Sequence, residues 1–388
     1  MLNNIKVIDV GGFITGPLAC SMLGDLGAQV TKIERPGSGD PFRAFSSGLY
    51  SPFFCSVNWN KRSMTLDLTQ SEGLELYKEL VTEADVVVQN FRPGAAEKLG
   101  IGYDAMQAIN PGLIYCAITG FGPSGPYKMR PSYDMVAQGM SGYLSLLMDF
   151  EDPWIPNPSA GDNLTGIYAA YGILGALVER GQTNKGRLVE VTMLDSMISF
   201  SAAQFAIAAT MKQLPARESR AALSQSYALP CSDGKAVVIH LSSPEHFWTN
   251  LLSAVERPEL ATDERFSERR LRIANYELLK QELRASFKTR SRDEWVKILD
   301  ANDVPCAPAY KLDEVRSDPQ VKHLDIFEDH VHPTEGPVLR VRRPVFYDGA
   351  RDELISVPPA LGEHTDEILR ELGRSEEDIG AYRADRIV

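Results

Sequence analysis

Short β-branched runs alternate with helix-forming segments between residues 5 and 118, and this order constrains the fold more than any other feature of the chain. A repeated strand and helix order predicts a parallel sheet with helices on both faces. We therefore expect an α/β protein. The predicted strands are residues 5–10, 28–33, 64–68, 86–88 and 113–118, with a later one at 187–192 and a helix at 194–211 that is mostly buried.

A second, smaller domain is expected, because 388 residues are enough for two domains that each bury a core. A polar stretch at 213–226 predicts a linker after the first part of a large domain at 1–212. Residues 227–330 predict a smaller α+β domain that starts with a hairpin around 232–234. Residues 331–388 are expected to return and complete the large domain.

The glycines after the first predicted strand invite comparison with a dinucleotide-binding loop, because Glu34 ends the second strand at about the distance of a ribose-binding acid. That fingerprint requires G-x-G-x-x-G, whereas residues 11–17 are Gly-Gly-Phe-Ile-Thr-Gly-Pro. The spacing therefore disfavours a nicotinamide or flavin enzyme, which we keep as an alternative.

Composition narrows the partners and the compartment. A formal net charge of -12 disfavours a nucleic-acid scaffold but allows a local basic pocket. The longest charge-free apolar stretches fall short of the ~20 residues that a bilayer requires, and no signal segment is recognised, so we expect a cytoplasmic protein without a membrane partner. Reduced, buried thiols are predicted for the five cysteines, which lack CxxC spacing: Cys20, Cys55, Cys116, Cys231 and Cys306.

The position of the histidines limits the chemistry. All six lie at or after His240, so a site built from the first 239 residues has no imidazole and cannot contain a Ser-His-Asp or Cys-His arrangement. His323, His330 and His332 are interpreted as surface loop histidines, not as a metal site. P-loop, HExxH and GxSxG motifs are absent from the sequence. For an enzyme, carboxylate chemistry remains.

Asp162 is the leading candidate carboxylate. It stands before the apolar segment 167–178, at the positive end of an expected helix dipole and near unpaired backbone N–H groups. Asp is also a common helix N-cap, so position alone leaves both a structural cap and a nucleophile open. Asp195 stands before the next helix in the same way, and we interpret it as a structural cap.

Several stretches, in the right order along almost the whole chain, resemble one protein family. They are residues 5–10 with 15–17, 25–28 with 32–34, 37–40, 60–63, 90–94, 120–122 with 125–126, and 361–365. The sequence resembles class III CoA-transferases, the family of formyl-CoA transferase, carnitine CoA-transferase and the α-methylacyl-CoA racemases. The resemblance implies a Rossmann-like large domain built from both chain ends, an inserted small domain, and an interlocked homodimer.

The resemblance also implies an activity. Asp162 falls on the family's catalytic aspartate, which attacks an acyl-CoA thioester and passes CoA to a carboxylic acid through an acyl-aspartyl anhydride and an aspartyl-CoA thioester. A carboxylate that is ionised at pH 7 needs no general base for this. Coenzyme A is then part of substrate and product, with no tightly bound cofactor and no metal.

Further site residues follow from matching positions in the family. The implied CoA contacts are Thr15, Arg35, Leu66, Asn90, Phe91, Lys98 and Arg130, and the implied substrate pocket contains Ile14, Tyr133 and Asp134. For each basic residue, a solvated surface charge is the alternative.

Two departures bear on the substrate. The racemase branch uses a histidine where this sequence has Tyr133, and a phenol with a reference pKa of about 10 is a poor base at neutral pH. Residues 240–244 are His-Leu-Ser-Ser-Pro, where formyl-CoA transferase has a glycine-rich loop, which disfavours oxalate or formate. A transferase is therefore favoured over two alternatives, an α-methylacyl-CoA racemase and a non-catalytic CoA- or dinucleotide-binding protein.

Overall fold

The computed structural model describes residues 1–46, 48–212, 214–215, 217–351 and 356–388. These residues cluster into two compact units, one of residues 1–144, 154–202 and 325–388, the other of residues 145–153 and 203–324. The predicted domains have different boundaries: the first part of the large domain is expected to end at 212 and the small domain to span 227–330, whereas the second unit contains residues 203–324. Residues 213 and 216 of the predicted linker and residues 352–355 of the return segment lie outside the described residues, and the linker's described part contains helix α10 (Ser219–Ser224).

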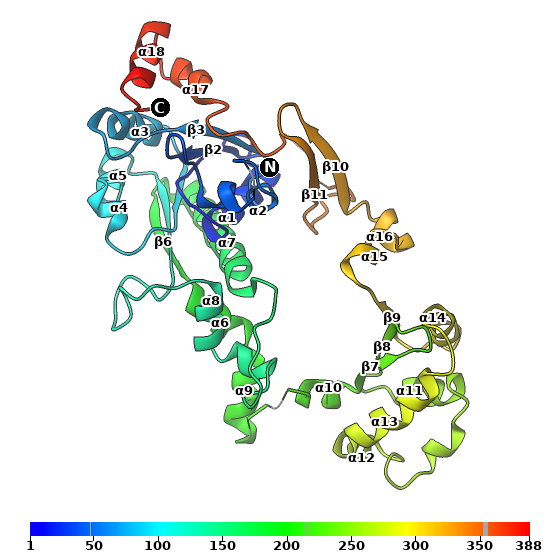
Figure 1. Cartoon of the computed structure of the whole chain (residues 1–388). Helices are drawn as coiled ribbons and strands as arrows, with labels where there is room; N and C mark the ends of the chain where they lie inside the picture. The colour runs from blue at the N-terminus through cyan, green and yellow to red at the C-terminus, as the bar shows by residue number, and fades with distance from the viewer. Residues whose placement is uncertain (47, 213, 216, 352–355) are drawn as a thin grey trace. The chain divides into compact units, whose positions relative to one another are not determined.

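The described residues of the first unit form a six-stranded parallel sheet in the order β3-β2-β1-β4-β5-β6 (Figure 1). The α/β prediction is confirmed, and the strand order reverses between β1 and β4, which is the Rossmann topology. The strands are β1 (Lys6–Asp9), β2 (Gln29–Glu34), β3 (Lys61–Thr65), β4 (Val86–Gln89), β5 (Ile114–Thr119) and β6 (Arg187–Thr192).

Successive strand residues face opposite layers of helices. Val7 packs with one layer and Ile8 with the other, as the period of two in a strand requires. The first layer contains α1 (Thr15–Asp25) and α7 (Ala160–Thr183). The second contains α3 (Ser71–Thr82), α4 (Ala95–Lys98), α5 (Tyr103–Ile109), α17 (Thr365–Glu371) and α18 (Glu376–Ala384).

Strand β3 begins three residues before its predicted start, at Lys61. The sequence pattern is polar here, yet Lys61 and Ser63 are buried because each finds a partner on another strand of the sheet. Lys61 Nζ donates to Asp9 Oδ2 at 2.8 Å, and Ser63 Oγ donates to Glu34 Oε1 at 2.7 Å. The apolar residues that suggested a strand at 64–68 therefore lie at its end and beyond it.

A glycine sets the packing of α7 on α1. A Cβ added at Gly166 would lie 2.9 Å from Leu18 Cδ2 and 3.0 Å from the backbone oxygen of Thr15. The close approach of the two helices therefore depends on glycine at this position, one turn after Asp162.

The segment after β6 forms two helices, not one, namely α8 (Met193–Phe200) and α9 (Ala202–Met211). The prediction of a mostly buried helix over 194–211 is wrong for α9, which has no buried residue among those described. The Gly- and Pro-rich loops before α7 hold α6 (Asp134–Met140) and the 3-10 helix η2 (Tyr143–Leu146). Two more short elements, η1 (Pro41–Phe45) and α2 (Pro52–Ser56), follow β2.

The histidines near the C-terminus are not loop residues. His330 and His332 belong to the hairpin of β10 (Phe327–His332) and β11 (Gly336–Val341), and His323 ends α16 (Pro319–His323). His332 is only 2% exposed and packs on Tyr50, with ring centroids 5.0 Å apart. The loop interpretation is therefore wrong for all three histidines. The surface interpretation holds for His323, which is exposed, but is wrong for His332, because the hairpin packs its ring against Tyr50.

The second unit has its own core, centred on Trp248, Phe287 and Trp295. The predicted hairpin is confirmed by the antiparallel pair β7 (Ser226–Pro230) and β8 (Ala236–His240). A third strand, β9 (Cys306–Ala309), pairs antiparallel with β8. The helices are α11 (Glu245–Ala254), η3 (Pro258–Ala261), α12 (Arg269–Ala274), α13 (Tyr276–Phe287), α14 (Arg292–Ala301) and α15 (Leu312–Val315).

The five cysteines are unpaired; Cys306 is half-buried and the other four are buried. None of the helices in the described part of the chain has the combination of length and apolarity needed to cross a membrane.

Candidate active site

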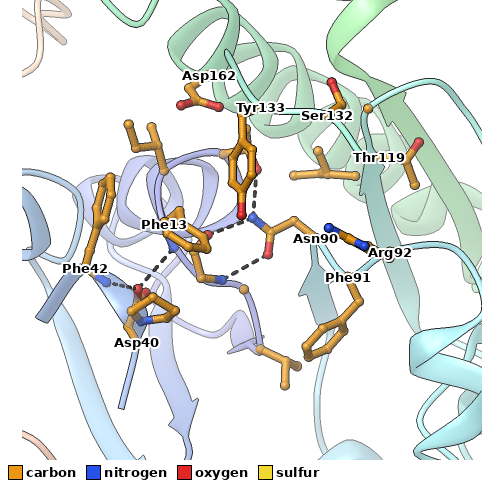
Figure 2. A pocket seen from close by; sticks show the side chains of 18 of the residues that line it. Phe13, Asp40, Phe42, Asn90, Phe91, Arg92, Thr119, Ser132, Tyr133 and Asp162 are labelled. Carbon is orange, nitrogen blue, oxygen red and sulfur yellow. Dashed lines mark hydrogen bonds between the residues drawn. The ribbon is translucent and has the colours of Figure 1, made fainter. Parts of the chain in front are cut away.

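A cavity of about 1030 Å³ opens in the first unit where the strand order reverses. Residues that follow β1 and β4 line it, together with the loop before α6 and the start of α7. Ligands of open α/β sheets bind in this place, outside the carboxyl ends of the strands. Figure 2 shows the side chains that meet there.

Asn90 ties the loop after β1 to the end of β4. Its Oδ1 accepts from the backbone N–H of Gly12 at 2.9 Å, and its Nδ2 donates to the Gly12 oxygen at 2.7 Å and to Thr15 Oγ1 at 2.9 Å. The dashed lines in Figure 2 follow these bonds. Asn90 therefore holds the loop in place, besides any contact with a ligand.

Phe13, which the sequence did not single out, adopts an unusual backbone conformation with a φ of 61°. Bulky side chains rarely occupy this left-handed region. Here the Phe13 N–H donates to Asp40 Oδ1 at 3.1 Å, while Asp40 Oδ2 lies 3.0 Å from Lys32 Nζ. This buried pair stabilises a backbone that directs the Phe13 ring into the cavity.

Asp162 lies in the first turn of α7 and is not its cap. The N-cap is Ser159, whose side chain accepts no capping hydrogen bond. Instead, the backbone N–H of Asp162 donates to Oδ1 of Asp134 at 3.1 Å. Asp195 likewise lies inside the first turn of α8, where Thr192 is the cap. The cap interpretation is therefore wrong for both aspartates, and for the same reason: each helix begins before the apolar segment from which its start is predicted.

The carboxyl group of Asp162 is half-buried and not fully ionised at neutral pH. Burial, and then the negative charge of Asp134, raise the pKa of Asp162 to about 7. The expectation of a carboxylate already ionised at pH 7 needs this correction, because desolvation and a like charge outweigh the helix dipole. At neutral pH the Asp162 carboxyl group is therefore partly protonated.

Asp134 and Asp162 differ in how their oxygens are engaged. Asp134 is 8% exposed, and its Oδ2 accepts from Gln138 Nε2 at 2.7 Å while its Oδ1 accepts from the Asp162 N–H. No described residue donates a hydrogen bond to the Asp162 carboxyl oxygens. Of the two, Asp162 is therefore the one whose carboxyl oxygens accept no hydrogen bond from a described residue.

Basic side chains line other parts of the cavity. Arg35 and Arg130, both predicted, are joined by Arg92 and Lys128, which the prediction missed. Arg92 lies inside the motif 90–94 that carried the family resemblance, so its position could have suggested it. Lys98, in α4, is not among the described residues that line the cavity.

The other predicted positions converge. Besides Asn90 and Asp162, the cavity lining includes Ile14, Thr15, Leu66, Phe91, Tyr133 and Asp134. Phe13, Asp40 and Phe42 also line it and were missed. Phe13 owes its place to a positive φ, for which the sequence gives no local signal. Asp40 lies inside the motif 37–40 that carried the family resemblance, so its position could have suggested it.

Glu34 is unavailable to a ribose, because Arg43 and Ser63 engage both of its oxygens. Arg43 Nε lies 2.7 Å from Oε2, and Arg43 Nη2 lies 2.8 Å from Oε1. Glu34 therefore does not serve as the ribose-binding acid that the dinucleotide alternative requires. Among the described residues, no three His, Cys, Asp or Glu side chains gather as a metal site would require.

Comparison with known proteins identifies the family. Residues 2–365 match the model of CoA-transferase family III. The chain belongs to this family. Its CoA-transferase relatives include human succinyl-CoA:glutarate CoA-transferase, 32% identical with 96% of this chain and 86% of the relative covered. Formyl-CoA:oxalate CoA-transferase of Shigella sonnei is 30% identical, with 100% of this chain and 99% of the relative covered.

A CaiB/BaiF family protein from Brucella suis has a similar structure, with a TM-score of 0.85, 34% sequence identity, and coverage of 96% of this chain and 99% of that one. These findings confirm the family resemblance and the enzyme class that the sequence motifs indicated. The family III CoA-transferase fold thus places its cavity at the reversal point of the parallel sheet in this chain.

Proposed function

We propose that this protein transfers CoA from an acyl-CoA thioester to a carboxylic acid, with Asp162 as the nucleophile. The free carboxyl oxygens of Asp162 in the cavity carry the proposal. Ser132 and Thr15 also line the cavity, but no His or Cys does so among the described residues, so a hydroxyl nucleophile has no imidazole to activate it. A carboxylate needs no such base.

The proposed reaction balances without proton transfer. A carboxylate oxygen of Asp162 attacks the thioester carbonyl carbon, the C–S bond breaks, and CoA leaves as a thiolate from an acyl-aspartyl anhydride. The thiolate then attacks the Asp162 carbonyl carbon and releases the donor acid as a carboxylate. The acceptor carboxylate reverses both steps, which yields the new acyl-CoA and restores Asp162.

Coenzyme A enters and leaves as part of these substrates, and we propose no tightly bound cofactor. The basic residues Arg35, Arg92, Lys128 and Arg130 suit its phosphates, since Arg and Lys bind phosphate oxygens through charge-assisted hydrogen bonds. From the family resemblance we also propose that Lys98 contacts CoA, that Phe91 packs against it and that Asn90 forms hydrogen bonds with it.

Mass spectrometry of the Asp162 peptide tests the mechanism. After incubation with acyl-CoA, the wild type should carry a CoA or acyl mass on this peptide, and hydroxylamine should remove it. Asp162→Asn should carry neither and lose CoA exchange, with an unchanged circular dichroism spectrum. Retained exchange in Asp162→Asn would contradict the proposal.

The same incubation in heavy water separates the racemase alternative. A racemase would incorporate deuterium at the α-carbon of a 2-methylacyl-CoA without any acceptor acid. We expect no such incorporation, because Tyr133, which stands in place of the racemase histidine, is a phenol.

We also infer a homodimer in the cytoplasm, with a large domain formed by both chain ends. Apolar side chains that a soluble monomer would bury are exposed on one face of α7: Ile167 is 46%, Tyr171 75% and Val178 69% exposed. Light scattering coupled to size-exclusion chromatography tests this, and a monomer at micromolar concentration would contradict it.

A further inference from the structure

An unbroken row of aromatic rings lines the cavity, made of Tyr133, Phe13, Phe42 and Phe45. The Phe13 ring meets Tyr133 and Phe42 at centroid distances of 5.9 and 5.3 Å, and Phe42 meets Phe45 at 4.8 Å. All three contacts are edge-to-face, the arrangement that aromatic pairs favour. Of the row, Tyr133 is 62% and Phe45 57% exposed, so apolar ring surface stays open to a ligand.

The aromatic row lies in a different part of the cavity from Phe91 and Arg92, which are proposed to contact CoA (Figure 2). In Figure 2, Phe13 and Phe42 lie to one side of Asn90, while Phe91 and Arg92 lie to the other; Asp162 and Tyr133 are drawn above Phe13. Tyr133, at one end of the row, directly precedes Asp134, whose Oδ1 accepts from the Asp162 N–H at 3.1 Å. An acyl group attached to Asp162 would therefore start near the aromatic row.

The charges near Asp162 disfavour a second carboxylate on the substrate. The charge of its neighbour Asp134 raises the pKa of Asp162, and no Lys or Arg among the described residues lowers it. The two buried basic side chains that neighbour Asp40 and Phe42, Lys32 and Arg43, are engaged with other groups. Lys32 Nζ contacts Gly11 O at 2.8 Å and Asp40 at 3.0 Å, and Arg43 is paired with Glu34.

We propose that the acid exchanged by this enzyme is a monocarboxylic acid with an aromatic or similarly large apolar body, which packs on Phe13, Phe42 and Phe45. The inference rests on the proposed function, because it assumes that the acyl group is bound to Asp162. It separates this chain from relatives whose names specify the dicarboxylates glutarate and oxalate.

The half-reaction tests this with three donors of defined chemistry: 3-phenylpropanoyl-CoA, hexanoyl-CoA and glutaryl-CoA. The rate at which CoA mass appears on the Asp162 peptide is measured for each with the full chain. We expect the rate to be highest with 3-phenylpropanoyl-CoA and at least about tenfold lower with glutaryl-CoA, because a charged end would be desolvated without a partner.

Phe45 and Phe53 provide a matched pair of variants. Phe53 is 53% exposed and packs against Phe42 and Phe45, but it does not line the cavity. Phe45→Ala should lower the rate with 3-phenylpropanoyl-CoA by about 5- to 10-fold, from the loss of an aromatic contact, and change the glutaryl-CoA rate little. Phe53→Ala should leave both rates unchanged.

The outcomes separate this inference from the proposed function. A glutaryl-CoA rate equal to or above the 3-phenylpropanoyl-CoA rate, or equal effects of the two variants, would overturn the substrate class while Asp162 remained the nucleophile. If none of the donors modifies Asp162, the proposed mechanism fails, and the inference about the substrate fails with it.

Discussion

The backbone N–H of Asp162 donates a hydrogen bond to the side chain of Asp134, 28 residues earlier, at 3.1 Å. Asp134 thereby does for α7 what the side chain of Ser159 does not, and it adds a negative charge beside the proposed nucleophile. One side chain thus positions Asp162 and raises its pKa.

The rate of the transferase should therefore depend on pH in a defined direction. In the proposed mechanism only the ionised Asp162 attacks. Burial and the charge of Asp134 raise its pKa to about 7, so kcat/KM should fall about tenfold per pH unit below that value. In Asp134→Asn, the amide oxygen still accepts the Asp162 N–H but the charge is gone. The acid limb should move to lower pH by about one unit.

Asp134→Ala is the control for the hydrogen bond. It removes both charge and acceptor, so its rate at high pH should fall below that of Asp134→Asn, whose Oδ1 preserves the geometry. Identical pH profiles for wild type and Asp134→Asn, measured with one acyl-CoA, would show that Asp134 has no electrostatic effect.

Two glycines of α7 should respond in opposite ways to alanine. At Gly166 the added Cβ meets Leu18 and the backbone of Thr15, so Gly166→Ala should lower the free energy of unfolding by about 1–3 kcal/mol and slow transfer by displacing Asp162. At Gly175 a Cβ meets nothing within 4 Å, so Gly175→Ala should stabilise the protein by about 0.5–1 kcal/mol. Denaturant unfolding measures both, and equal effects would contradict the packing argument.

The buried pair of Arg43 and Glu34 should be sensitive to removal of one partner. Arg43→Met leaves the Glu34 carboxylate buried without its cation and should lower the free energy of unfolding by about 3–5 kcal/mol. The double variant with Glu34→Gln removes the stranded charge and should recover part of this loss. A double variant no more stable than the single one would count against the argument.

The same pair predicts how stability depends on pH. Burial alone would raise the pKa of Glu34, but hydrogen bonds and charges from Arg43 and Lys32 lower it overall. Its stabilisation is therefore complete above the unfolded-state pKa of about 4.3 and is lost as pH falls through the lower folded-state value. Arg43→Met should lose this dependence, which acid titration of urea midpoints can measure.

CoA binding separates Arg130 from Lys98. Arg130 lines the cavity, so Arg130→Ala should raise KM for acyl-CoA by about 5- to 30-fold, the loss of one charged hydrogen bond to phosphate. Lys98 does not line it, and Lys98→Ala should have a smaller effect. If the two substitutions raise KM equally, Lys98 contacts CoA as the family resemblance implies, although it does not line the cavity.

The sequence predicted the sheet well because strand and helix periods are local properties. It misplaced β3 because Lys61 and Ser63 are buried by partners on other strands, which no local pattern reveals. The same limit applies to the site. Asp162 could be chosen as a candidate from motifs and the absence of upstream histidines, whereas Phe13 depends on the Asp40 and Lys32 pair, which tertiary structure brings together.

The pKa of Asp162 exceeded prediction for a related reason. A helix dipole can be anticipated from an apolar segment. Burial, and then the charge of Asp134, raise the pKa of Asp162 only because α6 and α7 meet in space. The role of Asp162 as nucleophile stays a prediction.

The C-terminal helices also bear on the order in which the protein can fold during synthesis. The N–H of Thr65, at the end of edge strand β3, donates to Thr365 Oγ1, and the N–H of Asp67 donates to the backbone oxygen of Ile387. Since a ribosome makes residues 203–324 earlier, the second unit has all of its segments while the first still lacks this edge. After Asp162 has been synthesised, the first unit therefore stays incompletely folded until residues 365–387 have been made.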